Sequence, residues 1–226
     1  MENPGFDVQL LARGSVTTRR LLVATGLRDV LPDIPGLEER WARDVLHCPY
    51  CHGYEVRDKA PGVLGWLSHA VGFVQIVRQW SEDLVYFAPP GALSAAERDQ
   101  LAARGIVVME GSVRQVLVHE DRLYGVELDH DAVPRDALFV PPRFAPNNDL
   151  LIELGCEHDD EGWPITQADA RTSVAGVWVA GNVANPRARV ITAAGEGSAA
   201  AIGINADLVD EDVRDALSRT ASPRGA

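Results

Sequence analysis

The residues best suited to chemistry in this sequence are two cysteines separated by two residues, Cys48 and Cys51, with His52 directly after them. Two thiols at this spacing can close a small disulfide, and a thiolate forms more easily in such a motif than in an isolated cysteine. The chain has only three cysteines. The third, Cys156, has no partner nearby in the sequence and is expected to be a small buried apolar residue.

Three interpretations of the Cys-x-x-Cys-His pattern compete: a dithiol/disulfide centre, half of a zinc site, or a haem attachment site. Haem attachment needs export and usually a distal ligand, but the first residues lack a signal peptide and the only methionines are Met1 and Met109. Structural zinc needs four ligands, no second cysteine pair exists, and His119 and His130 lack zinc-ligand spacing. The redox interpretation is favoured, and no metal site is expected.

The composition bounds the class of protein. The chain has 226 residues, 46% of them hydrophobic and 24% charged, which is ordinary for a globular protein with one large domain or two small ones. A net charge of −12 without a basic patch argues against nucleic acid and anionic membrane surfaces as partners. No apolar run is long enough to span a membrane. We expect a cytoplasmic protein.

Two proline-rich connectors, 32–36 and 141–146, divide the pattern of elements. Between them strands and helices alternate, which predicts an α/β domain with a parallel sheet. The expected strands are 62–65, 84–87 and 106–109, the expected helices are 69–80 and 94–103, and a β-hairpin is expected over 113–118 and 123–128. Ser94 and Glu97 form the pattern of a capping box.

The segments outside the connectors are expected to contain strands and one long helix. Residues 6–11 and 20–26 predict two strands around a turn, and 176–182 predict a buried strand that ends in glycine. Residues 192–209 predict a long helix that is rich in glycine and alanine at its start. Residues 218–226 are expected to be a frayed tail.

Four blocks of this sequence, in order, give it a resemblance to a known family. They are Leu22-Val23-Ala24-Thr25-Gly26 with Pro32-x-Ile34-Pro35-Gly36, then His47-Cys48-Pro49-Tyr50-Cys51-His52-Gly53-Tyr54-Glu55, the turn that begins at Gly65, and Val179-Ala180-Gly181-Asn182-Val183 followed by Thr192-Ala193-Ala194-Gly195-Glu196-Gly197. With these blocks the chain resembles the low-molecular-weight thioredoxin reductases, which are pyridine nucleotide-disulfide oxidoreductases. The resemblance covers nearly the whole chain.

The resemblance implies an α/β fold of two nested Rossmann-like domains of the three-layer ββα type. An FAD-type domain would consist of 1–36 and 144–218, and an NAD(P)-type domain, which carries the cysteines, of 37–143, with 219–226 as a tail. The implied cofactors are FAD and NADPH. The implied cofactor-binding residues are Thr25, Gly26, Gly181, Asn182, Arg189, Val190 and Ala193 for the first domain, and Gly65 and Ala70 for the second.

The resemblance also assigns roles to Cys48, Cys51 and His52 as catalytic residues. Cys51 would face the flavin, and Cys48 would be the thiol that exchanges with the substrate. His52 stands where many relatives have an acid/base aspartate, and an imidazole can take a proton from one thiol and return it to a leaving thiolate. The alternatives are that His52 only caps a turn and that Tyr50 simply packs.

The sequence departs from the family at both nucleotide sites. No Gly-x-Gly-x-x-Gly precedes Leu22, so we expect the FAD-type domain to be incomplete at its N-terminus and FAD to be held weakly. Asn182 replaces the aspartate that holds the ribityl chain of FAD. In the second site Leu67 occupies a glycine position next to the pyrophosphate, and Ala88-Pro89-Pro90 offers neither acid nor arginine to a ribose. The departures at this second site argue against NADPH binding.

Several functions stay open on this sequence. The first is a thioredoxin reductase-like enzyme that exchanges electrons between a flavin and the Cys48/Cys51 pair. The others are a flavin-dependent dithiol oxidase that uses oxygen, a flavin-free thiol-disulfide module, and a truncated inactive remnant. The expected partner is a thioredoxin-like protein or a small dithiol, and a homodimer is the assembly considered.

Overall fold

The computed structural model describes residues 5–11, 14–67 and 70–221, and these form two compact units. The central unit is Asp29–Arg143. The terminal unit combines the described residues up to Arg28 with those from Phe144 onward. The chain therefore starts in the terminal unit, forms the central unit and returns.

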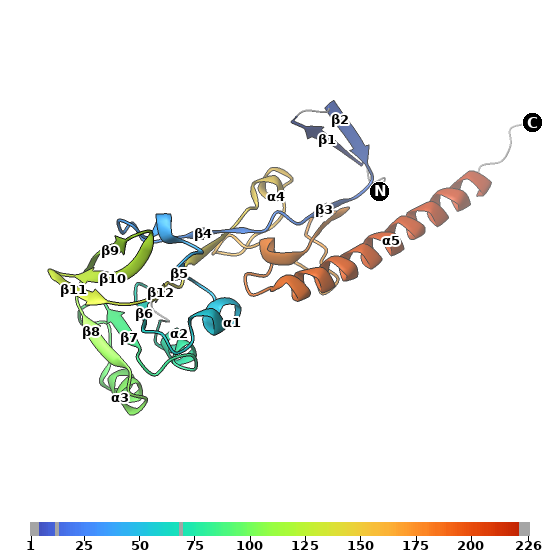
Figure 1. Cartoon of the computed structure of the whole chain (residues 1–226). Coiled ribbons are helices and arrows are strands. Elements are labelled where there is room, and N and C mark those ends of the chain that lie inside the picture. The colour runs from blue at the N-terminus through green and yellow to red at the C-terminus, as the bar shows by residue number, and fades with distance from the viewer. Residues whose placement is uncertain (1–4, 12–13, 68–69, 222–226) are drawn as a thin grey trace, which may run out of the picture. The chain divides into compact units, whose positions relative to one another are not determined.

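A five-stranded parallel sheet organises the central unit (Figure 1). The helices α2 (Ala70–Val77) and α3 (Ala95–Ala103) connect successive strands of this sheet. This confirms the predicted α/β class, although His69, where we expect the first helix to start, lies outside the described residues. In spatial order the strands are β5 (Val45–Leu46), β12 (Ala137–Phe139), β6 (Pro61–Leu64), β7 (Val85–Ala88) and β8 (Val107–Glu110).

The central sheet is buried on both faces, as its apolar strands require. Side chains that alternate along β6 and β7 enter two separate clusters. One cluster contains Val74 of α2 and Leu101 of α3, and the other contains Val116 and Val126 of an antiparallel sheet. That sheet consists of β9 (Val113–His119), β10 (Arg122–Leu128) and β11 (Asp131–Pro134). The result is a three-layer ββα unit, as predicted.

Two of the local predictions in this unit are confirmed in detail. Ser94 accepts a hydrogen bond from the Glu97 backbone N–H, and the Glu97 carboxylate accepts one from the Ser94 N–H, which completes the capping box of α3. The predicted hairpin is the β9–β10 pair. Strand β11, which extends this hairpin to a three-stranded sheet, was not part of the prediction.

The terminal unit contains fewer buried side chains. A hairpin of β1 (Phe6–Leu10) and β2 (Gly14–Thr18) precedes β3 (Leu21–Val23), which pairs in parallel with β14 (Val177–Val179). Helix α4 (Asp149–Glu153) and the long helix α5 (Val190–Ala221) complete the unit. Strands β4 (Leu27–Val30) and β13 (Arg143–Pro146), which carry the chain between the units, form a two-stranded sheet.

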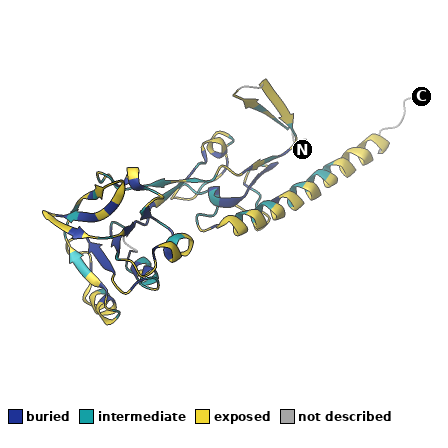
Figure 2. Cartoon of the chain, viewed as in Figure 1, coloured by how far each residue is buried: buried dark blue, intermediate teal, exposed yellow. Residues whose placement is uncertain are grey.

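Helix α5 is longer than the predicted 192–209. It extends to Ala221, so the part of the expected tail from Ser218 to Ala221 is helical, while 222–226 lie outside the described residues. Figure 2 shows that most of α5 is exposed, and its apolar side chains Ile202 and Leu217 are 70% and 64% exposed. Apolar packing therefore does not explain why its C-terminal half is ordered.

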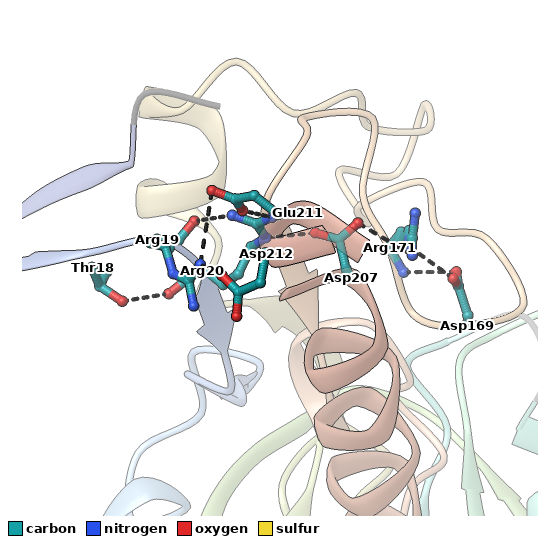
Figure 3. A network of polar contacts seen from close by, with 8 residues as sticks. All are labelled: Thr18, Arg19, Arg20, Asp169, Arg171, Asp207, Glu211 and Asp212. Carbon is teal, nitrogen blue, oxygen red and sulfur yellow. Dashed lines mark hydrogen bonds and ion pairs between the residues drawn. The ribbon is translucent and has the colours of Figure 1, made fainter. Parts of the chain in front are cut away.

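Polar contacts hold this half of α5 to the start of β3 (Figure 3). The Arg20 side chain is only 4% exposed, and its guanidinium contacts the carboxylates of Asp207, at 2.6 Å, and Glu211. Arg19 pairs at 2.5 Å with the exposed Asp212. A buried arginine with two carboxylate partners fixes the helix position because each charge needs the other once water is excluded.

None of the described helices is long and apolar enough to cross a membrane.

Candidate redox site

Cys48 and Cys51 lie directly after strand β5. Cys48 is the N-cap of the short helix α1 (Pro49–His52), and Pro49 occupies its first position, where a fixed φ suits a helix. The two sulfurs form a disulfide whose Cα atoms are 5.2 Å apart, inside the usual range. The Cys51 backbone N–H also donates to Cys48 Sγ over 3.2 Å. The local fold therefore presents the pair as a closed disulfide.

The two cysteines differ in access to solvent. Cys48 is 2% exposed, whereas Cys51 is exposed. Tyr50 and Tyr54 are 70% and 64% exposed, so the interpretation that Tyr50 simply packs is wrong. The Arg57 guanidinium lies 3.9 Å from the centroid of the Tyr54 ring. Two aromatic side chains and Cys51 are thus exposed on the same short segment.

His52 has a carboxylate partner that the sequence analysis missed. Its Nδ1 lies 3.2 Å from Glu55 Oε2. A carboxylate at Nδ1 favours the tautomer that carries a proton there and leaves Nε2 free for proton transfer. A histidine followed three residues later by a glutamate across a helical turn was the available signal.

Gly53 fixes the position of this segment against the helical layer. It begins the 3₁₀ turn η2 (Gly53–Val56) and is buried. A Cβ on Gly53 would overlap the indole ring of Trp80. No side chain other than hydrogen therefore fits without displacing either Trp80 or the turn beside His52.

We expect Gly53→Ala to lower the stability of the chain by about 1–3 kcal/mol, because overpacking forces side chains and backbone to shift. Gly72→Ala is the matched control. Gly72 lies on α2 with nothing within 4 Å of an added Cβ, so the helix should gain about 0.5–1 kcal/mol. Thermal unfolding of both variants measures this, and equal midpoints would contradict the proposed packing.

The described residues of the central unit do not form a metal site. Among them, no group of three or more histidine, cysteine, aspartate or glutamate side chains is placed to hold a metal ion.

The third cysteine, Cys156, lies in the terminal unit. It is buried as expected, and its Sγ lies 3.5 Å from Thr172 Oγ1.

The predicted nucleotide turn of the central unit begins at Gly65, after β6. A Cβ on Gly65 would overlap the Tyr86 ring. Packing against Tyr86 is therefore enough to require glycine here, without a bound nucleotide. Trp66 Nε1–H donates to the Pro141 carbonyl over 2.7 Å. Ala70 is buried at the start of α2, and positions 68 and 69 between them lie outside the described residues.

Three features of the described part of this turn oppose NADPH binding. The cavity beside Trp66, Leu67 and Tyr86 has a volume of about 190 Å³, and even drug-sized ligands occupy pockets of about 300–1,000 Å³. Glu97 also lines it, and hydrogen bonds from the side chain and backbone of Ser94 lower the pKa of that carboxyl group. A carboxylate opposes the phosphates of a dinucleotide, and Pro89 at the end of β7 provides no N–H.

The Thr25–Gly26 turn of the terminal unit is tied to the chain that returns from the central unit. Thr25 Oγ1 donates to the Asn147 carbonyl over 2.6 Å, and Asn147 Nδ2 donates to the Thr25 carbonyl over 3.0 Å. Gly26 has φ of +72°, which favours glycine, and nothing lies within 4 Å of a Cβ added there. The structure therefore leaves open space beside Gly26.

A second loop, with Gly181 and Asn182, faces the first turn of α5. The 3₁₀ turn η3 (Gly181–Val183) follows β14, and Gly181 has φ of +74°. Asn182 Nδ2 donates to the carbonyls of Asn185 and Ala188 over 3.0 and 3.1 Å. Its amide protons are therefore used inside the loop, and the acceptor Oδ1 is what it can offer to a ligand hydroxyl.

Three further predicted residues lie where α5 begins. Arg189 precedes the helix, and its carbonyl accepts the Ala193 N–H over 2.8 Å. Val190, the first helical residue, is 90% exposed. A Cβ added to Gly181 would lie 3.4 Å from the Cβ of Ala193, so the two residues are close neighbours. Small residues at a helix N-terminus suit an electron-rich ring. The loop and the helix end are close enough to act on one ligand, and their role in binding the flavin end of FAD stays a prediction.

Comparisons with known proteins assign the chain to a family. The family model for pyridine nucleotide-disulphide oxidoreductases matches residues 74–197, more than half of the sequence. The chain belongs to this family. The thioredoxin reductase sirT of Leptosphaeria maculans is 28% identical over 212 residues, which cover 86% of this chain and 64% of sirT.

Two solved structures show the same fold. HlmI is 50% identical, with a TM-score of 0.91 over 98% of this chain and 70% of HlmI. An oxidoreductase from Agrobacterium tumefaciens is 31% identical, with a TM-score of 0.82 over 92% of this chain and 71% of its own. The predicted resemblance and fold class are confirmed. The chain spans 64% of the length of sirT.

Proposed function

We propose that this chain is a flavin-linked disulfide oxidoreductase of the thioredoxin reductase type, in which Cys48 and Cys51 alternate between disulfide and dithiol. The observation that carries the proposal is the closed disulfide with one exposed cysteine, Cys51, directly before His52. Membership of the family supports it. An exposed disulfide beside an imidazole can exchange with an incoming thiolate.

In the proposed exchange, electrons and protons pass only between the substrate and the Cys48–Cys51 pair. A substrate thiolate attacks one sulfur of the Cys48–Cys51 disulfide, forms a mixed disulfide, and releases the other sulfur as a thiolate. The second substrate thiol then attacks the mixed disulfide, which releases a substrate disulfide and leaves both cysteines reduced. Two electrons and two protons pass to the pair. Reduction of a substrate disulfide is the same sequence in reverse.

His52 is proposed to move protons at Nε2 during these steps, because Glu55 occupies Nδ1. The resemblance assigns the flavin side to Cys51 and the substrate side to Cys48. Cys51 is exposed, so its sulfur is open to either role. Cys48 is 2% exposed, so exchange at Cys48 needs a local opening of the segment around α1.

FAD is the proposed cofactor. Asn182 and the start of α5 would hold its flavin end, and the resemblance to the family adds Thr25 and Gly26 as further contacts. When bound, FAD supplies two-electron exchange with the reduced cysteine pair. The described part of the terminal unit has no glycine-rich strand-to-helix turn for the pyrophosphate. We therefore expect weak retention of FAD by the chain alone.

A second candidate is a dithiol oxidase in which oxygen takes the electrons from the flavin. The turn at Gly65, with Tyr86 packed on it and Glu97 lining the small cavity, supports this direction because these side chains oppose NADPH binding. The substrate would then be a small dithiol, in place of a thioredoxin-like protein. A homodimer is the proposed assembly.

The test is to add FAD to the purified chain, record its visible spectrum, and measure oxygen uptake with dithiothreitol and NADPH oxidation with thioredoxin. Flavin bands with dithiol-dependent oxygen uptake and no NADPH oxidation support the oxidase. NADPH oxidation that depends on thioredoxin supports the reductase. A colourless protein that lacks both activities contradicts the flavin-linked proposal, and continued thiol-disulfide exchange by it would indicate the flavin-free module.

A further inference from the structure

Glu196 lies on the second turn of α5 and contacts the loop after β14 with both carboxylate oxygens. Oε2 accepts the backbone N–H of Gly181 over 2.9 Å, and Oε1 accepts the Asn185 Nδ2 amide over 2.6 Å. The two donors stand four residues apart in the loop that joins β14 to α5. A single half-buried carboxylate therefore closes this loop onto the helix.

The loop is also cross-linked within itself. The Gly181 carbonyl accepts the backbone N–H groups of Ala184 and Asn185, both over 3.0 Å. Asn185 Oδ1 accepts the Arg187 N–H over 3.1 Å. With the Asn182 contacts already described, these bonds make residues 181–188 one stiff unit. Its attachment to α5 through Glu196 then decides where that whole unit lies.

We propose that Glu196 is a positioning residue for the flavin site, because it fixes the distance between Asn182 and the first turn of α5. This inference rests on the proposed function. Gly181 and Asn185 donate to the Glu196 carboxylate and so transmit its position to Asn182, which lies between them in the chain. Hydrogen bonds to an ionised acceptor are stronger than neutral ones, which suits a carboxylate to this task.

The chemistry of the contact explains why glutamate is used. Gly181 has positive φ, and its N–H points toward α5, so an acceptor must reach it from the helix. Glutamine keeps one acceptor oxygen but presents an NH₂ group to a second donor. Alanine provides no acceptor and leaves the Gly181 N–H and the Asn185 amide without that partner.

The experiment measures FAD affinity of the full chain by quenching of flavin fluorescence. Glu196→Ala is expected to raise the Kd for FAD by about 10- to 100-fold, the range for a lost pair of hydrogen bonds to a charged group. Glu196→Gln keeps one acceptor oxygen and is expected to recover only part of this loss. Asp210→Ala, an exposed acidic residue on the same helix, is the control and should match the wild type.

Two additional measurements separate positioning from simple loss of stability. The visible band of the bound flavin reports its surroundings and is expected to shift in Glu196→Ala but not in Asp210→Ala. Amide exchange at Gly181, followed by NMR without FAD, is expected to accelerate in Glu196→Ala. A Kd within twofold of the wild type and an unchanged band would overturn the inference.

Failure of the proposed function gives a different result. A wild-type chain that takes up no FAD contradicts that function and the flavin part of this inference with it. Exchange at Gly181 still decides whether Glu196 holds the loop: slow exchange in the wild type and fast exchange in Glu196→Ala support it. Equal rates in the two proteins overturn the inference whatever the flavin result.

Discussion

Replacing Cys48 or Cys51 by serine is expected to abolish dithiol/disulfide turnover, with a loss of about 1,000-fold or more for either variant. The two sulfurs act as one redox unit, so removing one removes the reaction and the double variant should be no worse than a single one. The structure supports this expectation because the pair forms a disulfide and the third cysteine lies in the terminal unit. Turnover is measured with dithiothreitol or an oxidised dithiol, with FAD added.

Cys156→Ser is the matched control for this prediction. It removes a thiol that is 7% exposed and packed among apolar side chains, so it should alter stability slightly and leave exchange intact.

The Cys48 and Cys51 single variants are expected to differ in the intermediate that they accumulate. If Cys48 is the exchange thiol, Cys51→Ser should trap a mixed disulfide with substrate, detectable by mass spectrometry. Full turnover by Cys48→Ser would contradict the redox assignment.

Arg20→Met is expected to destabilise the terminal unit by about 3–5 kcal/mol. The side chain is 4% exposed and bonded to Asp207 and Glu211. Removing it leaves two carboxylates on α5 without their common partner, and the cost of breaking such a buried group is of this size. Thermal unfolding and amide exchange along α5 provide the measurement.

Arg19→Met is the neighbouring control. Arg19 is 48% exposed and pairs with Asp212, which is 62% exposed, so its loss should cost no more than about 1 kcal/mol. The exchange of α5 amides after residue 207 should accelerate strongly in Arg20→Met and weakly in Arg19→Met. Equal effects would show that the buried network does not hold the helix.

The elements that could be predicted from the sequence are those fixed by residues close together in the chain. The capping box of α3 depends on Ser94 and Glu97, three residues apart, and the β9–β10 hairpin joins adjacent segments. The disulfide also closes between near neighbours. In each case the chemical partners are visible in one short stretch, so pattern and structure agree.

The features that were missed depend on partners far apart in the sequence. The C-terminal half of α5 is held by Arg20, 187 positions before Asp207, and no local pattern marks that pairing. Gly53 is required by Trp80 and Gly65 by Tyr86, so neither glycine reveals its reason locally. In the redox site, Glu55 was within reach of pattern analysis, since it stands three residues after His52.

The pairing of β3 with β14 has a consequence for how the protein is made. Residues 21–23 are synthesised some 150 residues before their partner strand and before α5, which follows that strand. The central unit, whose strands are all contained in one continuous stretch, can fold while synthesis continues. During that interval β3 is without its partner strand, so its backbone N–H and C=O groups are unpaired on that side.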